Sequence, residues 1–545
     1  MSDKLIADIL KRYEKGLSDR ATWLSHVDEC YEFCKPRKAG AAEDSKGGRK
    51  HQKVYNGVAE DALDVYASGM NGGITPQTGQ WFLLEPKDAA LKDDHAVKAW
   101  TEEVTDIILS VLEGSNFQNE VHEVYIDSGV AGTACMYMEE DPQDVVRFST
   151  RHYREYVFFE DHRGKADTCM RKLELTARQA KQKFGDAAGE RVKELLQNNT
   201  PDEKVVFIHA VYPRTDRNVQ SKHKKHMPFA SLYIEKSKKE LVQEGGYVEF
   251  PFAIVRNTKV CSELDGRSPA MKALYDIEEV QRMERTSAEA AEKMVNPAIL
   301  APNDNSFSPM SGAAGKIMWY EPRSDGRGSG IEPFPFAGNP NIGIEMVARK
   351  EKAVRRPFLY DIFITLPELD PNVTAAAVNI AKSERLGVLG PTLGRHKKEL
   401  LEPVVMRVFG ICNRAGMFPP PPENLNELDV RYTSPLILAQ EMASDVEAID
   451  QDVQFAGAVS EVYPEVWDNL DLDEALRTRH KRFNGPSSVM RDKKSVAKTR
   501  EEREKAQAAA QQQEAAMQMA PQMMEQMGGM NGGDGSQMVA PEGIQ

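Results

Sequence analysis

The sequence predicts an α+β protein, in which a mostly antiparallel sheet is accompanied and followed by helices. In the first 130 residues, apolar side chains recur at spacings of three, four or seven, which is typical of amphipathic helices. From residue 133 to about 260 the pattern changes to short β-rich runs separated by turn residues. Helical periodicity returns from residue 271 onward. Together these observations favour a sheet domain carrying helices, with further helical segments after it.

The N-terminal residues 4–34 are expected to form one amphipathic helix or a helix pair joined near Gly16. His26, Cys30 and Cys34 follow one another at intervals of four and share a face of this helix. They could be metal ligands, but no second Cys/His pair with zinc spacing follows, so core packing is favoured. Residues 35–53 are basic and rich in glycine, which predicts a solvated loop or an arm that contacts nucleic acid or a neighbouring subunit.

Helices are expected at 55–70, 94–112 and 117–128, the first ending at a turn formed by Asn71, Gly72 and Gly73. A short buried strand is expected at 81–84, between the first two of these helices. The predicted strands of the sheet are 133–139, 145–148, 156–160, 168–175, 205–212, 229–235 and 252–256. A helical insertion capped by Thr176 interrupts them.

Residues 271–294 are expected to form a long helix that ends at Asn296 and Pro297. A second helix is expected at 341–358, after a segment rich in Pro, Gly, Ser and Asn. Further on, Gly390 and Pro391 are expected to break the chain between a helix at 374–388 and one that starts at Thr392. Pro403 should bend the latter helix, and Gly416 with four prolines should end it.

Composition sets limits on function. A net charge of −14 argues against a protein that wraps DNA tightly, because such proteins neutralise many phosphates with Lys and Arg. Six scattered cysteines suit a reducing cytoplasm, the charged N-terminus is unlike a signal peptide, and no apolar run has the length of a membrane span. We therefore expect a soluble product, synthesised in the cytoplasm and without membrane contact.

Two glycine-containing stretches invite comparison with nucleotide loops. Residues 71–73 lack the P-loop Lys and Ser/Thr, and at 312–316 the first Gly and the final Ser/Thr of the motif are missing. We assign no catalytic residue, no cofactor and no metal.

Several segments together resemble one family. At the C-terminal side they read GVLGPTLGRHKKELLEPVVMRVFGI, RAGMFPPPPE and RYTSPLILAQ; earlier, and in the family's order, they read SGMNGGITPQTGQWFLLEP, HAVYPR and GRSPAMKAL. This combination is similar to the head-to-tail connecting, or portal, proteins of short-tailed bacteriophages. The resemblance covers most of residues 1–440 and implies the portal-protein fold.

The domains implied by the resemblance are the wing (1–270), a stem helix (271–296), the clip (297–339), a second stem helix (340–361), the tunnel loop (362–375), the C-terminal wing (376–433), a helical crown (434–505) and a low-complexity tail (506–545). We expect the tail to be disordered, or alternatively to order as an axial helical bundle.

The implied function is a ring of twelve copies at one capsid vertex of the virion, through which double-stranded DNA passes non-specifically. The implied partners are the terminase large subunit, tail adaptor proteins, and the major capsid and scaffolding proteins. The alternatives are another virion structural or scaffold protein, or a DNA-packaging enzyme, which would require a Walker motif or a carboxylate cluster for metal ions. Neither of these features is evident in the sequence.

Three groups of residues follow from the resemblance. The basic side chains expected near passing DNA are Lys293, Arg349, Lys350, Lys352, Arg355 and Arg356; a solvated basic helix is the alternative. The tunnel-loop candidates are Leu366, Pro367, Glu368, Leu369, Asp370 and Pro371. The clip candidates for contact with the motor or adaptor are Asn303, Asp304, Arg323, Asp325 and Arg327.

Overall fold

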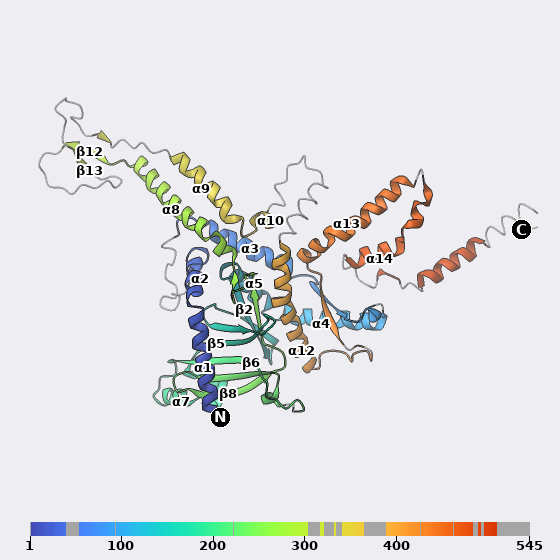
Figure 1. Ribbon diagram of the computed structural model, residues 1–545, viewed down its shortest axis with the longest axis horizontal. Coiled ribbons are helices and arrows are strands. Elements are labelled where there is room, and N and C mark those ends of the chain that lie inside the picture. The colour runs from blue at the N-terminus through green and yellow to red at the C-terminus, as the bar shows by residue number, and fades with distance from the viewer. Residues whose placement is uncertain are drawn as a thin grey trace, which may run out of the picture. The chain divides into compact units, whose positions relative to one another are not determined.

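A computed structural model gives the fold (Figure 1). It describes residues 2–39, 54–92, 94–221, 223–302, 317–320, 332–333, 340–364, 389–423, 425, 427–460, 463–482, 489–491 and 495–508. The chain divides into two compact units, Met1–Ala443 and Ser444–Gln545. Helices and antiparallel sheets are mixed in the first unit, which confirms the α+β class.

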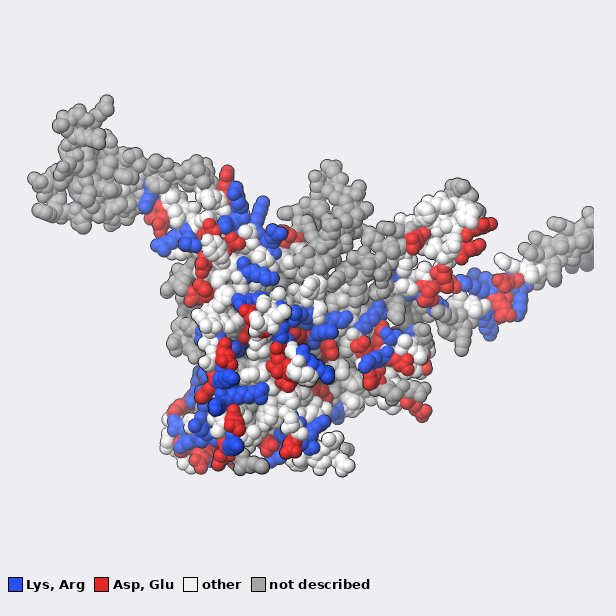
Figure 2. Space-filling model, viewed as in Figure 1, with Lys and Arg blue, Asp and Glu red and all other residues white. Residues whose placement is uncertain are grey.

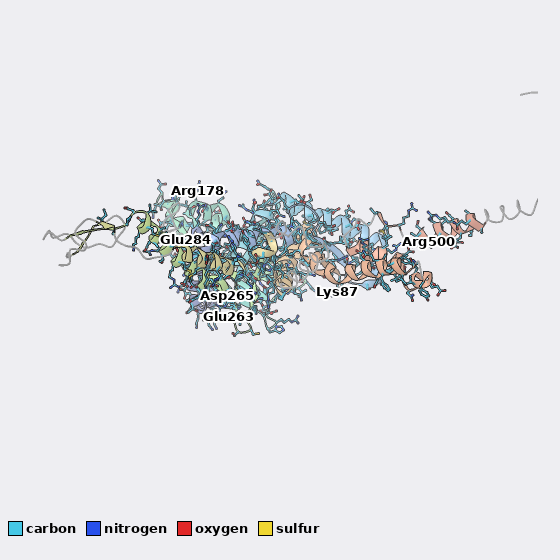
Figure 3. All side chains as sticks on the ribbon, turned by 90° about the horizontal axis from the view of Figure 1, so that it is seen from above. Lys87, Arg178, Glu263, Asp265, Glu284 and Arg500 are labelled. Atoms are coloured by element: carbon cyan, nitrogen blue, oxygen red, sulfur yellow. The ribbon has the colours of Figure 1, made fainter. Side chains whose placement is uncertain are left out.

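The N-terminal region is a helix pair, α1 (Ser2–Asp19) and α2 (Ala21–Cys34), joined at Arg20 and not at Gly16. The reason is a buried ion pair. The Arg20 guanidinium donates two hydrogen bonds to Asp265, of 2.9 and 3.0 Å, and a third to the carbonyl of Tyr156. Asp265, labelled in Figure 3, lies immediately before the short strand β11 (Gly266–Arg267), which leads into the long helix α8, so this pair fixes the joint to that distant segment.

Three helices and one strand build the helical side of the first unit: α3 (Val58–Ile74), α4 (His95–Gly114), α5 (Phe117–Val130) and β1 (Phe82–Pro86). The predicted end of α3 at Asn71–Gly73 was wrong, because the helix continues to Ile74. Its glycines provide close packing: a Cβ at Gly69 would stand 2.3 Å from the Phe363 ring, and one at Gly73 would stand 3.1 Å from Leu436. Tertiary contacts thus override the local turn signal.

The predicted strands are antiparallel as expected, but they form two sheets, so the expectation of one sheet was wrong. The three-stranded sheet has the order β3-β2-β9 and consists of β2 (Thr133–Asp141), β3 (Val145–Arg151) and β9 (Phe252–Arg256). The five-stranded sheet runs in sequence order through β4 (Tyr156–Glu160), β5 (Ala166–Thr176), β6 (Lys204–Pro213), β7 (Phe229–Glu235) and β8 (Glu240–Tyr247). Strand β8 was missed because its two glycines lower its β-propensity.

Helices cover the five-stranded sheet. Helix α1 packs Ile6, Ile9 and Tyr13 into a cluster with side chains of β4 to β7. The predicted insertion after Thr176 consists of α6 (Ala177–Phe184) and α7 (Glu190–Gln197). It begins with a complete capping box, in which the Thr176 hydroxyl accepts the Gln179 N–H and the Gln179 side chain accepts the Thr176 N–H. The helix start predicted at Thr176 is confirmed.

Smaller elements complete the first unit. They are η1 (Pro36–Lys38), η2 (Ala89–Leu91), η3 (Gly185–Ala187), η4 (Lys224–His226), β10 (Thr258–Lys259), β11 (Gly266–Arg267), β12 (Ile299–Pro302), β13 (Ile317–Tyr320), β14 (Glu332–Pro333), α10 (Tyr360–Ile364) and β15 (Leu428–Tyr432). Strand β15 pairs antiparallel with β1, across more than 340 residues of sequence.

The helix around residue 400 starts earlier than predicted, and it has a π-helical turn beside Pro403. Leu389 and Gly390 are already helical, so the predicted helix start at Thr392 was wrong by at least three residues; burial of Leu389 and Leu393 in the core holds this turn in place. The helix predicted at 374–388 lies outside the described residues. A π-helical turn, η5 (Lys397–Leu401), precedes α12 (Glu402–Arg414). In it the Glu402 N–H donates to the Lys397 carbonyl, five residues back, beside Pro403, which has no N–H.

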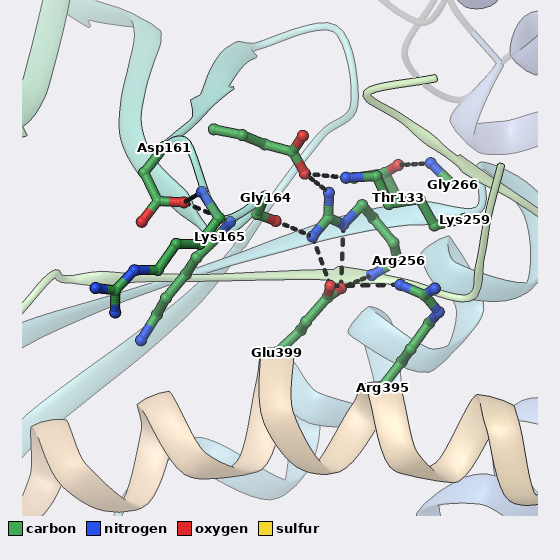
Figure 4. A network of polar contacts seen from close by, with 11 residues as sticks. Thr133, Asp161, Gly164, Lys165, Arg256, Lys259, Gly266, Arg395 and Glu399 are labelled. Carbon is green, nitrogen blue, oxygen red and sulfur yellow. Dashed lines mark hydrogen bonds and ion pairs between the residues drawn. The ribbon is translucent and has the colours of Figure 1, made fainter. Parts of the chain in front are cut away.

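The π-helical turn presents Glu399 to Arg256 of strand β9 (Figure 4). One Glu399 oxygen accepts the Arg256 N–H at 2.8 Å and its Nε at 3.2 Å, and the other accepts Nη2 at 2.5 Å. Arg256 is also bound by Glu160 at the end of β4 and by the carbonyl of Gly164. The Arg256 side chain is only 3% exposed, so the site holds little water. Through these contacts Arg256 connects both sheets to the helix.

A second polar contact lies where the two sheets meet. His209 of β6 is fully buried; its Nδ1 accepts a hydrogen bond from Arg171 Nε at 3.0 Å, and its Nε2 lies 3.0 Å from the Ser231 hydroxyl. The ring stacks on Tyr233 at 4.0 Å. Burial, and then the charge of Arg171, hold the pKa of His209 well below its ordinary value. The neutral ring is therefore part of the folded structure.

The second unit is helical in its described part. Helix α13 (Pro435–Val459) starts in the first unit, and η6 (Pro464–Asn469), α14 (Leu472–Arg482) and a helical segment at 495–508 follow. Arg500 makes two hydrogen bonds, of 2.5 and 2.7 Å, to Asp473 of α14. The helices predicted beyond residue 440 are confirmed within these ranges, and most of the predicted tail lies outside the described residues.

We predict that Glu399→Gln destabilises the first unit by about 3 kcal/mol, because Arg256 then keeps a single carboxylate partner in a buried site. Urea unfolding followed by circular dichroism measures the change in the free energy of unfolding. Glu402→Gln, which changes an exposed carboxylate on the next turn, is the matched control and should cost under about 0.5 kcal/mol. Equal effects of the two substitutions would contradict the proposed importance of the Arg256 contact.

We also predict that stability falls as the pH is lowered below about 6.5. Below that pH the unfolded chain binds a proton at residue 209 that the folded chain excludes, so the free energy of unfolding decreases by up to about 1.4 kcal/mol per pH unit. His209→Gln should flatten this dependence between pH 6.5 and 5, in chemical denaturation measured at several pH values. The exposed His223→Gln is the control. An unchanged slope in His209→Gln would contradict the prediction.

Candidate functional site

The candidate site is a pair of helices, α8 (Pro269–Val295) and α9 (Pro340–Arg355), which run side by side (Figure 1). Helix α8 begins where the Ser268 hydroxyl accepts the Met271 N–H at 2.9 Å, with Pro269 in the first turn. Its last residue is Val295, and Asn296 caps it immediately before Pro297. The sequence prediction of these two helices is confirmed, although α9 ends three residues earlier than expected.

Two contacts hold the helix pair together. Lys350 of α9 reaches across to α8, where its Nζ lies 3.0 Å from Asp276 and 2.6 Å from Glu279. These hydrogen bonds, to Glu279 first and then to Asp276, raise the pKa of Lys350 above its ordinary value. Farther along, a Cβ at Gly343 would stand 2.7 Å from the Ser287 hydroxyl, so glycine allows the helices to approach closely.

One end of the pair is anchored in the main core. Ala273, Ile277 and Val280 of α8 and Val354 of α9 are fully buried there. The anchored end fixes the direction of both helices relative to the three-stranded sheet and α3, which share that core.

The two helices also expose large apolar side chains. Tyr275 is 71% exposed, and the others are Met294, Val295, Ile344 and Met346. A groove of about 470 Å³ between the helices includes Tyr275 and Met346 in its lining. The exposed apolar side chains that line this groove, Tyr275 and Met346, offer surface for an interaction.

The six basic candidates separate into two groups. Arg349, Lys352 and Arg356 are exposed and stand three and four residues apart, along one side of α9 and its end. Figure 2 shows Lys and Arg side chains gathered over this part of the molecule. Lys293, near the end of α8, is half-buried.

Lys350 and Arg355 are engaged within the chain. Lys350 is held by the two carboxylates of α8. The Arg355 guanidinium lies over the Tyr360 ring, 4.9 Å from its centre, and 3.8 Å from Asp61. Their structural contacts give a reason for their presence that does not involve DNA.

The remaining candidates cannot be placed. Leu366 to Pro371, expected in the tunnel loop, and Asn303, Asp304, Arg323, Asp325 and Arg327, expected in the clip, lie outside the described residues. Of the segment 297–339, the structure describes three short paired strands, β12 with β13 parallel and β12 with β14 antiparallel.

No group of three or more His, Cys, Asp or Glu in the described part of the chain is arranged to hold a metal ion. Cys30 and Cys34 of the candidate metal motif are instead fully buried in the main core. Burial raises the pKa of the Cys30 thiol to about 12, which keeps it protonated and inert. Among the described helices, none has the length and apolar character to cross a bilayer.

Sequence reasoning missed Asp276 and Glu279, the partners that remove Lys350 from the exposed group. Their spacing of three residues places them on one face of α8, and this signal was present in the sequence. It could be interpreted only once α9 was known to pack against that face.

Comparison with known proteins matches nearly the whole chain. The family model described as "Bacteriophage head to tail connecting protein" matches residues 7–490. A "Probable portal protein" of Bordetella phage BPP-1 is 28% identical over 512 residues, which is 92% of each chain. A "Portal protein" of Salmonella phage epsilon15 is 28% identical over 513 residues, again 92% of each chain. The chain therefore belongs to the bacteriophage head-to-tail connecting protein family.

Proposed function

We propose that this chain is a portal protein, which forms a ring-shaped conduit at one capsid vertex for packaging and ejection of genomic DNA. The observation that carries the proposal is the family match over residues 7–490, together with two portal relatives that align over 92% of both chains. Its role is that of a virion component, structural and not enzymatic.

The α8–α9 pair supports this proposal as the wall of the conduit. A ring of identical subunits, which we propose has twelve copies, needs heterologous contacts that close, and therefore complementary faces on each subunit. The exposed Tyr275, Ile344 and Met346 offer apolar surface for such contacts. The ion pairs of Lys350 keep the two helices together as one stiff unit.

Charge supports non-specific DNA passage. With a net charge of −14 the chain repels DNA as a whole, while Arg349, Lys352 and Arg356 provide a local attraction that ring symmetry repeats. A duplex that moves past such a surface is guided without being held tightly.

The partners we propose are those of a capsid vertex: the terminase large subunit during packaging, tail adaptor proteins afterwards, and the major capsid and scaffolding proteins around the ring. The proposed contact residues for the motor and the adaptor remain the clip residues predicted from the sequence, and residues 366–371 remain the proposed tunnel loop.

We predict that the purified protein forms a closed ring with a mass that is a multiple of 60.9 kDa. Light scattering after size-exclusion chromatography and negative-stain imaging measure the mass and the shape. An open shell would favour a scaffold protein, and a monomer under all conditions and in virions would refute the proposal.

We further predict that replacing Arg349, Lys352 and Arg356 together by Gln leaves ring assembly intact and weakens binding of duplex DNA. The slope of log K against log salt should become shallower, by about 0.9 for each phosphate that the variant no longer neutralises. Fluorescence anisotropy with a labelled duplex at several salt concentrations measures this slope. Replacing the exposed Lys11, Lys15 and Arg178 by Gln changes the net charge equally and should leave the slope unchanged.

A further inference from the structure

A pocket of about 430 Å³ lies in the first unit, apart from the α8–α9 pair. Three segments enclose it: the hairpin between β4 and β5, strand β9 with the residues before it, and the helix that runs through η5 into α12. Its size falls in the range of ligand sites, about 300–1,000 Å³. The proposed conduit function does not use it.

One wall of the pocket is apolar. Phe252 and Ile254 of β9 are buried beneath it, and Met406 of α12 stands at its edge with 43% of its surface exposed. Because Met406 is flexible and polarisable, it adapts to different apolar partners.

The pocket is basic, in a protein that is acidic overall. Five of its lining residues are cations and three are carboxylates. Two of those carboxylates are neutralised within the chain, Glu399 by Arg256 and Glu249 by Arg414 and Arg407. Lys165 and Lys398 are exposed, and no ion pair among the described residues engages them.

Arg407 supplies an independent sign of a ligand. Its side chain is 1% exposed and lines the pocket, and its Nη1 donates to Glu249 at 2.5 Å. Its Nε and Nη2 atoms have no hydrogen-bond partner in the described structure. Nη2 lies 3.6 Å from a Glu140 oxygen, which is an ion-pair distance but too long for a hydrogen bond. Buried guanidinium donors are ordinarily satisfied, most strongly by a carboxylate.

We propose that this pocket binds an acidic peptide segment of a partner protein. A carboxylate of the peptide would meet Arg407 and the two lysines, and a neighbouring apolar side chain would pack against Phe252, Ile254 and Met406. Among the lining carboxylates, Glu402 has no ion pair in the described part of the chain, and its charge disfavours a continuous phosphate chain such as DNA, whereas a peptide with spaced carboxylates avoids it. The inference does not depend on ring formation.

The test is fluorescence anisotropy with the full-length protein and a fluorescein-labelled ten-residue peptide of alternating glutamate and leucine. We expect saturable binding, and at least tenfold weaker binding of peptides in which serine replaces leucine or glutamine replaces glutamate. Lys165→Gln with Lys398→Gln should weaken binding at least tenfold, as should Arg407→Lys, which keeps the charge but loses the guanidinium. Lys11→Gln with Lys193→Gln, equally exposed and outside the pocket, should change it less than twofold.

Circular dichroism melting shows whether a variant that binds the peptide weakly is still folded. If Arg407→Lys fails to fold, the variant with Lys165→Gln and Lys398→Gln, which changes only exposed lysines, still tests the proposal. Equal binding of the serine and leucine peptides, or an unchanged affinity in the Lys165 and Lys398 variant, would overturn the proposal. Displacement of the peptide by equimolar inorganic phosphate or by duplex DNA would also overturn it, because the site would then be a general anion site.

Discussion

The first unit depends on the neutralisation of Arg256. This side chain leaves the three-stranded sheet and binds Glu160 of the five-stranded sheet and Glu399 of the helix, three elements that lie far apart in sequence. The site is nearly dry, so the loss of either carboxylate leaves the buried charge of Arg256 less well compensated. Arg256 also donates to the Gly164 carbonyl, so the β4–β5 turn is fixed to the same point. One guanidinium therefore connects both sheets and the helix, in addition to the apolar cluster that the two sheets share.

Pro403 connects this contact to the helix geometry. A proline inside a helix removes one N–H, and here the turn before it has the wider π-helical spacing. That turn carries Glu399 toward Arg256, and the next turns carry Met406 and Arg407 into the pocket wall. The sequence predicted a disturbance at Pro403. It could not predict that the disturbance would orient a carboxylate, because Arg256 is 143 residues away in the chain.

Structure set by neighbouring residues could be predicted from the sequence, whereas contacts between residues far apart in the chain could not. Thr176, Asn296 and Gly416 act on their neighbours alone, and the helix limits predicted from them agree with the structure to within a few residues. Gly73 was misread because its function is to accommodate Leu436, a contact that no local rule contains. Division of the strands into two sheets depends likewise on pairings such as β2 with β9, across more than 110 residues. The family resemblance, which draws on whole segments in order, predicted the family that the comparison shows; it did not predict these contacts.

The number of basic residues in helix α9 does not by itself show how many of them are available to bind a ligand. Arg349 and Lys350 are adjacent in sequence, yet about 100° of helical rotation separates their side chains. Lys350 faces the carboxylates of α8 and stabilises the helix pair, while Arg349 faces outward with Lys352 and Arg356. A count of charges therefore overstates the cations available to a ligand. Under the proposed conduit function, few free cations on an acidic body would attract DNA weakly, and weak attraction suits a duplex that has to move past the surface.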